Sequence, residues 1–133
     1  MKYKYILSLL LGLSAVVYAA DKQPFITIDD RESLKQIFDK SVMENLDKKL
    51  TEDQYFIYKK ALEYALTNGQ VETIISWDGP DPVTISGSIT ILKVNNTLQC
   101  KDFTQTVSFK EVTFEGKGTG CVVDNKWLIR RDK

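Results

Sequence analysis

The stretch that decides the fold is Cys100-Lys-Asp-Phe-Thr-Gln-Thr-Val-Ser-Phe-Lys-Glu-Val-Thr-Phe-Glu-Gly-Lys-Gly-Thr-Gly-Cys121. It is bounded by the two cysteines of the chain, placed almost symmetrically about its middle. If Lys110 and Glu111 form a two-residue turn, the cysteines face each other at a non-hydrogen-bonded pair. Such pairs have α-carbons about 4.5 Å apart, within the roughly 4.4–6.8 Å that a disulfide requires. We therefore predict two antiparallel strands joined by a disulfide. A longer loop with the same centre is the alternative, because Lys-Glu is a poor two-residue turn.

The same register divides the hairpin side chains between two faces. One face is apolar, and its aromatic rings lie across the glycines of the second strand, with Gln105 as the polar exception. The other face carries hydroxyl groups and charges. We predict an interaction surface on this polar face and at a nearby turn, with the candidate residues Thr104, Thr106, Ser108, Thr113, Asp78 and Asp81.

Two helices are expected before the strands. The stretches Asp29-Asp-Arg-Glu32 and Thr51-Glu-Asp-Gln54 have the spacing of capping boxes, whose side chains satisfy free backbone N–H groups at a helix start. Apolar residues recur with the helical period after each stretch. Asn68-Gly69 predicts a left-handed end to the second helix.

From residue 70 the apolar period changes to two, which is typical of strands. Strands are expected near residues 71–77 and 85–91, in the two hairpin arms, and at 126–130. Helices first and strands afterwards indicate an α+β fold. We predict one domain over residues 20–133, in which N-terminal helices (about 29–68) pack on a five-stranded antiparallel β-meander (about 70–131) with one disulfide.

Residues 1–19 have the features of a signal peptide. Two lysines precede a short apolar run, and small or tolerated residues lead up to Ala19. The run is shorter than the ~20 apolar residues that span a bilayer. We expect cleavage after Ala19 and no stable membrane span afterwards; an uncleaved anchor is the alternative. Export to an oxidising compartment agrees with a disulfide.

The charge balance gives no sign of a nucleic-acid partner. The chain has 18 basic and 18 acidic residues, and without Lys2 and Lys4 of the leader the balance is 16 − 18 = −2. Nucleic-acid binding needs clustered Lys and Arg. We interpret the adjacent Arg130 and Arg131 as a solvated end.

No catalytic, metal-binding or cofactor-binding residues are predicted. Histidine, the commonest general base, is absent, and a disulfide leaves no thiolate. Asp78 and Asp81 flank a proline turn, where a carboxylate pair can bind a cation or act as acid and base. Turn chemistry explains both residues more simply. Trp77 and Trp127 lie on apolar strand faces, which favours core packing over a sugar-binding platform.

Six short motifs follow one another along the chain: Ala61-Leu-Glu-Tyr-Ala65, Ile75-Ser-Trp77, Gly87-Ser-Ile89, Cys100-Lys-Asp-Phe-Thr-Gln-Thr-Val107, Gly116-Lys-Gly-Thr-Gly-Cys121 and Trp127-Leu-Ile129. In this order they resemble the C-terminal domain of the bacterial 17 kDa surface antigen family. The likeness covers residues 50–130. Many members of that family also carry a lipobox cysteine and a glycine-zipper segment, whereas this chain has an amphipathic stretch at 29–50 instead.

The resemblance implies a secreted Gram-negative cell-envelope protein, periplasmic or associated with the outer membrane and cell surface. Family members are mostly known as antigens, which names no reaction. We therefore expect a non-enzymatic protein that binds another envelope protein or a cell-wall component. Two alternatives stay open: a periplasmic inhibitor of a cell-wall hydrolase such as lysozyme, and a small hydrolase that uses carboxylates.

Overall fold

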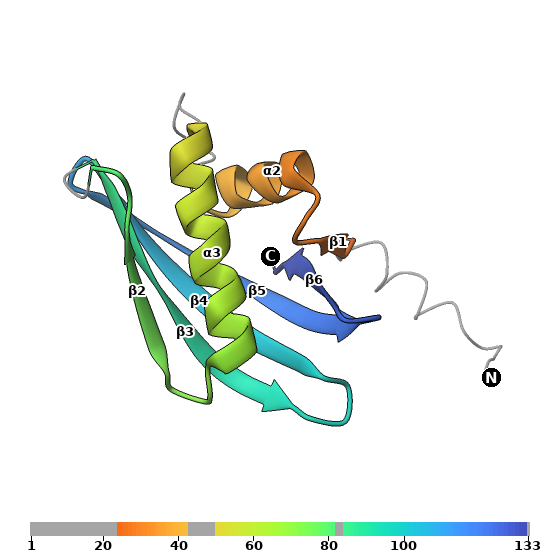
Figure 1. Ribbon diagram of the computed structural model, residues 1–133. Helices are drawn as coiled ribbons and strands as arrows, with labels where there is room; N and C mark the ends of the chain where they lie inside the picture. The colour runs from red at the N-terminus through yellow and green to blue at the C-terminus, as the bar shows by residue number, and fades with distance from the viewer. Residues whose placement is uncertain (1–23, 43–49, 82–83, 133) are drawn as a thin grey trace, which may run out of the picture.

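The computed structural model describes residues 24–42, 50–81 and 84–132, so the predicted signal peptide lies outside the described residues. The elements are β1 (Ile26–Thr27), α2 (Arg31–Val42), α3 (Glu52–Asn68), β2 (Ile74–Asp78), β3 (Ile85–Asn95), β4 (Cys100–Phe109), β5 (Val112–Val123) and β6 (Lys126–Arg131). The strands form one antiparallel sheet in the order β1-β6-β5-β4-β3-β2. Both helices lie on the same side of this sheet (Figure 1). The predicted α+β class is confirmed.

The prediction of five strands is wrong by one strand, and that strand precedes the helices. β1 has two residues, which pair with Ile129 and Leu128 of β6. Two residues are too few to show a strand period in a sequence, so β1 depends on its tertiary pairing. The other five strands follow the predicted order.

The cysteine hairpin has the predicted register. Lys110 and Glu111 form the turn, and ten pairs lead from it to Cys100 opposite Cys121. Both turn residues have positive φ, 50° and 72°, as in the tight hairpin turns that Asn-Gly favours. The disulfide joins Cys100 and Cys121, whose α-carbons are 4.0 Å apart.

The two helix starts differ in how well they follow the prediction. At α3 the capping box is confirmed, because Thr51 and Gln54 each accept the backbone N–H of the other with their side chains. At α2 the cap is one residue later than predicted: Asp30, not Asp29, accepts a backbone N–H of the first turn at 3.3 Å. Asp29 instead forms an ion pair with Lys59 of α3 at 3.1 Å. The acidic pair before α2 therefore both caps the helix and joins it to α3.

The end of α3 is extended, with Gly69 at φ −72° and ψ 142°, so the predicted left-handed end is wrong. Glycine is needed there for space, because an added Cβ would lie 2.5 Å from the Ala65 carbonyl oxygen and 2.7 Å from Ile91 Cγ1. Lys101 Nζ donates to the Gly69 carbonyl oxygen at 2.7 Å. This bond supplies a donor just beyond a helix end, where carbonyl groups lack intrahelical partners.

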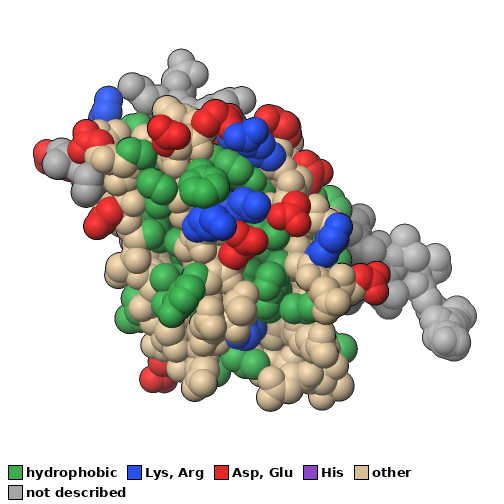
Figure 2. All heavy atoms as spheres, viewed as in Figure 1, with side chains coloured by type: hydrophobic (Ala, Val, Ile, Leu, Met, Phe, Trp, Pro, Cys, Tyr) green, Lys and Arg blue, Asp and Glu red, His purple; other side chains and the backbone are tan. Residues whose placement is uncertain are grey.

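The core lies between the helices and one face of the sheet. On the face of the sheet toward the helices, the buried side chains are Trp77, Ile85, Ile89, Ile91, Phe103, Gln105, Val107, Phe109 and Ile129. The ring of Trp77 lies 5.8 Å from that of Tyr58 on α3, which confirms its predicted core packing. On the outer side, the helices present apolar side chains between charges of both signs (Figure 2). In the described ranges the helices leave the other face of the sheet uncovered, and we call it the open face.

One extra residue in β3 changes which of its side chains point to each side of the sheet. Its pairing with β4 is regular as far as Ile91, and the register then shifts so that Lys93 pairs with Asp102. Leu92 is the bulged residue and is 46 % exposed. As a result, Lys93 lies on the open face, although an unbroken alternation would turn it toward the helices.

Candidate functional site on the open face

Rows of hydroxyl side chains cross the open face. Strand pairing gives one row of Ser76, Ser88 and Thr106 that ends at Glu115, and a second row of Asp78, Ser86, Ser108 and Thr113. Neighbouring strands are about 4.8 Å apart, so the hydroxyl groups repeat at about that spacing. A shallow hollow of about 320 Å³ lies over these rows. With Thr104 in the next row, five of the six predicted interaction residues share one face.

Asp81, the sixth of them, lies in the loop between β2 and β3. Its Oδ2 accepts the hydroxyl of Thr84 at 2.9 Å, and its carbonyl oxygen accepts the N–H groups of Thr84 and Ile85 at 2.9 and 3.1 Å. These are the hydrogen bonds of a turn, as the turn interpretation predicts. In the part of the chain that the structure describes, no group of three or more Cys, Asp or Glu side chains is placed to hold a metal ion.

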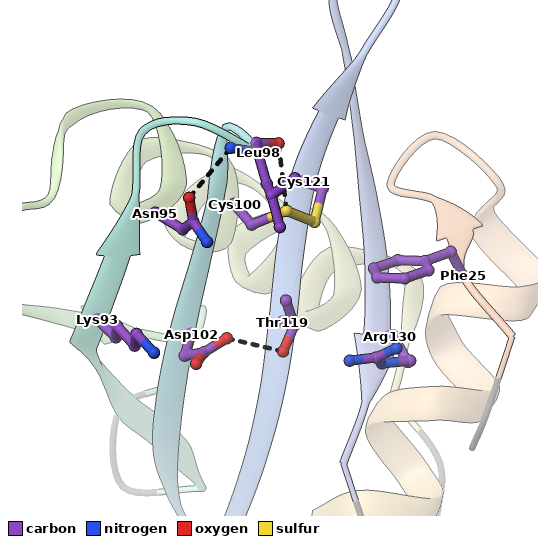
Figure 3. A pocket seen from close by; sticks show the side chains of 9 residues that line it. All are labelled: Phe25, Lys93, Asn95, Leu98, Cys100, Asp102, Thr119, Cys121 and Arg130. Carbon is purple, nitrogen blue, oxygen red and sulfur yellow. Dashed lines mark hydrogen bonds between the residues drawn. A yellow bond between two sulfur atoms is a disulfide. The ribbon is translucent and has the colours of Figure 1, made fainter. Parts of the chain in front are cut away.

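A second cavity of about 320 Å³ lies beside the disulfide (Figure 3). One part of its lining is a polar row, one residue from each of β3 to β6: Lys93, Asp102, Thr119 and Arg130. The other part is Asn95, Leu98, Phe25 and the disulfide itself. We call this cavity the disulfide pocket. It was not predicted, because the bulge places Lys93 there and the position of β1 places Phe25 there.

Arg130 is held in the disulfide pocket and is not a solvated end. Its guanidinium carbon lies 4.6 Å from the centre of the Phe25 ring. Its Nε is 3.9 Å from Asp132 Oδ1, and its side chain is 23 % exposed. Stacking on an aromatic ring restrains the guanidinium and leaves its edge available for a ligand.

The turn between β3 and β4 projects an apolar side chain next to this pocket. Asn95 Oδ1 accepts the N–H of Leu98 at 3.1 Å, and the Gln99 carbonyl oxygen accepts the N–H of Val122 at 3.0 Å. Cys100 then ties the turn to β5. Leu98 is 65 % exposed at the tip, so a fixed turn presents it to solvent.

A buried polar pair lies beneath the open face. Tyr58 of α3 and Gln105 of β4 are 2 % and 4 % exposed, and the Gln105 side chain hydrogen-bonds the Tyr58 hydroxyl. Gln105 Oε1 and Trp77 Nε1 have no hydrogen-bond partner among the described residues. Burial raises the pKa of Tyr58 well above its ordinary value of 10.0.

Stability is expected to fall above pH 10 because of Tyr58. The unfolded chain loses this phenolic proton near pH 10, whereas the folded state keeps it to higher pH. The folded state then binds more protons than the unfolded state, so the free energy of unfolding falls by about 1.4 kcal/mol per pH unit. Urea unfolding of Tyr58→Phe at pH 9.5 and 11 should show a smaller fall than that of the wild type.

The matched control for this measurement is Tyr64→Phe, since Tyr64 is on the same helix and is 58 % exposed. Burial lowers the pKa of Lys101, so this residue makes the free energy of unfolding rise with pH until the pKa of lysine in the unfolded chain is reached. The wild type and both variants share this effect, so the comparison between them isolates the tyrosine. An equal fall in the wild type and both variants would contradict the assignment.

The resemblance to the 17 kDa surface antigen family covers residues 50–130, and nothing in the geometry of the sheet identifies that family. The resemblance therefore stays a prediction. Within the described residues, no helix has the length and apolar character needed to cross a bilayer. No protein-family model, curated protein or solved structure matches this chain.

Proposed function

We propose that the protein is a non-enzymatic, exported binding protein of the Gram-negative cell envelope, and that its open face binds a cell-wall polymer. The observation that carries this proposal is the array of hydroxyl rows on a sheet whose other face is filled by α2 and α3. Predicted export and the disulfide support the location, because disulfides persist in oxidising compartments.

The hydroxyl rows suit a polymer rich in hydroxyl and amide groups. A Ser or Thr hydroxyl donates one hydrogen bond and accepts two, so it matches either kind of group on a ligand. These side chains are short and stand on strands, so little conformational freedom is lost when a ligand binds. A long polymer can contact many such weak sites at once, which multiplies the affinity.

Binding to insoluble cell walls is expected to depend on Thr106, in the centre of the array. A Thr106→Glu variant places a second carboxylate beside Glu115 of β5. It should reduce co-sedimentation with purified Gram-negative cell walls about tenfold or more, since an imperfectly paired charge is costly to desolvate. The matched control is Gln36→Glu, which adds the same carboxylate on the exposed side of α2. Wild-type protein that stays in the supernatant, or equal losses in the two variants, would refute the proposal.

One observation favours a second candidate, inhibition of a cell-wall hydrolase. The turn at residues 95–100 is fixed by the Asn95 side chain and by the disulfide, and it presents Leu98 to solvent. A preorganised loop loses little entropy on binding, which suits an inhibitor. If the protein inhibits any member of a lysozyme panel and Leu98→Asp abolishes that inhibition, the second candidate replaces the first.

A further inference from the structure

A single row of four side chains crosses the disulfide pocket. Its members, on β3 to β6 in turn, are Lys93, Asp102, Thr119 and Arg130. The order of charges along the row is positive, negative, neutral and positive (Figure 3). Because neighbouring strands are about 4.8 Å apart, the two cations start from backbone positions about 14 Å from each other.

The carboxylate inside this row is oriented and can still accept hydrogen bonds. Thr119 Oγ1 donates to Asp102 Oδ1 at 2.9 Å, and Thr119 is only 8 % exposed. This bond holds the carboxylate against β5. Within the described ranges, Asp102 Oδ2 has no hydrogen-bond or ion-pair partner, so it is available to a donor on a ligand.

The two cations differ in how they are held. Arg130 stacks on Phe25 and forms an ion pair with Asp132, so it is fixed before any ligand arrives. Lys93 is exposed and makes no ion pair or hydrogen bond with the described residues. One end of the row is therefore rigid, and the other can adjust to the length of a ligand.

The order of charges discriminates between classes of ligand. A simple anion placed between the cations meets Asp102, and a simple cation at Asp102 is flanked by Lys93 and Arg130. A ligand whose charges run negative, positive, negative satisfies all three groups and is repelled by none. In an extended peptide, alternate side chains point the same way about 6.6 Å apart, so residues i, i+2 and i+4 cover about 13 Å. That length is close to the length of the row.

The rest of the pocket suits the apolar parts of such a peptide. The disulfide, Leu98 and Phe25 border the charged row, and Leu98 and Phe25 are 65 % and 39 % exposed. Binding sites of this kind combine apolar walls with a few placed polar groups that fix orientation.

We propose, on the basis of the function proposed above, that the disulfide pocket binds an extended peptide segment of the cell-wall polymer in which a free amine lies between two carboxylates. The carboxylates pair with Lys93 and Arg130, and the amine pairs with Asp102. The hydroxyl rows then hold the remainder of the polymer.

The probe for this site is the peptide acetyl-Glu-Ser-Lys-Ser-Glu-amide, titrated into ¹⁵N-labelled full-length protein and followed by amide chemical shifts. Shifts should concentrate at the four residues of the row. The scrambled peptide acetyl-Glu-Glu-Ser-Ser-Lys-amide, of the same composition and net charge, should bind about three- to fivefold more weakly, the upper part of the range for loss of one ion pair near a surface. The inverted peptide acetyl-Lys-Ser-Glu-Ser-Lys-amide should bind more weakly still.

Variants separate this site from general attraction between charges. Lys93→Gln and Asp102→Asn should each weaken binding about three- to fivefold. Lys126→Gln removes an exposed lysine from the start of β6 and should leave binding unchanged within about a factor of 1.5. Thermal unfolding of each variant shows whether it is folded. If Asp102→Asn does not fold, the Lys93→Gln variant still tests the site, because Lys93 is exposed.

Three results would overturn the inference. The scrambled peptide could bind as tightly as the probe, Lys93→Gln and Lys126→Gln could lose equal affinity for the probe, or the amide shifts could fail to localise at the row. If the pentapeptide fails to bind while cell walls still sediment the protein in a Thr106-dependent way, only this inference fails. If the pentapeptide binds as expected and cell walls do not, the pocket stands and the cell-wall function fails.

Discussion

Replacing Gly87 with alanine is expected to lower the free energy of unfolding by about 2–3 kcal/mol, as overpacking does in a filled core. An added Cβ would lie 2.7 Å from the Thr106 carbonyl oxygen and 2.7 Å from two ring atoms of Trp77. Trp77 is 6 % exposed and the oxygen belongs to the backbone of β4, so neither neighbour can move cheaply. Glycine ordinarily weakens a strand, so strand propensity alone would predict that alanine stabilises the protein. The expected destabilisation has the opposite sign.

Urea unfolding of Gly87→Ala measures this effect, and Ser88→Ala is its control. Ser88 is the next residue of β3 and lies on the open face, where a truncation should change stability by less than about 0.5 kcal/mol. Trp77→Leu supplies a second check, since a smaller side chain relieves the clash. In a double-mutant cycle, the Gly87→Ala cost should shrink in the Trp77→Leu background. Additive costs would show that the ring is not the obstacle.

Removing the disulfide is expected to cost about 3 kcal/mol of stability, because the bridge closes a loop between cysteines with a sequence separation of 21 in the unfolded chain. That is a large part of the 5–15 kcal/mol typical of a whole domain. The double variant Cys100→Ala/Cys121→Ala should unfold at lower urea concentration but keep the far-ultraviolet circular dichroism of the wild type. The turn at residues 110–111 and nine further pairs maintain the register without the bridge.

Reductant provides the internal control for this second experiment. It should lower the unfolding midpoint of the wild type nearly to that of the double variant, and it should not change the double variant. Two thiols that react in the untreated protein, purified from the compartment to which export is predicted, would contradict the bridge. If the urea midpoint of the wild type is unchanged after confirmed reduction, the disulfide does not stabilise the protein by closing a loop in the unfolded chain.

The hairpin was predictable because its register follows from arithmetic. Counting from Lys110 and Glu111 fixes every pair, and Cys100 opposite Cys121 tests the count independently. The conformation of the turn was not predictable from its own residues, since both have positive φ, a conformation costly for residues other than glycine. Ten strand pairs outweigh that local cost, so tertiary structure overrides the turn preference.

The site was only partly predictable for a related reason. The hydroxyl rows follow from the alternation of each strand, and Thr104, Thr106 and Ser108 lie on one face as expected. The disulfide pocket depends on features that leave no periodic signal. Phe25 reaches it through the two-residue pairing of β1 with β6, and Lys93 reaches it through the bulge.

The bulge in β3 reverses, from Leu92 onward, which residues of the strand face each side of the sheet. Odd-numbered residues of β3 turn toward the helices before Leu92, and the even-numbered Val94 takes that side after it. Lys93, one of the two positive ends of the row in the disulfide pocket, therefore lies on the open face because of one extra residue in the strand. Matching this strand to any other by residue spacing alone would swap the two sides of the sheet from Leu92 onward.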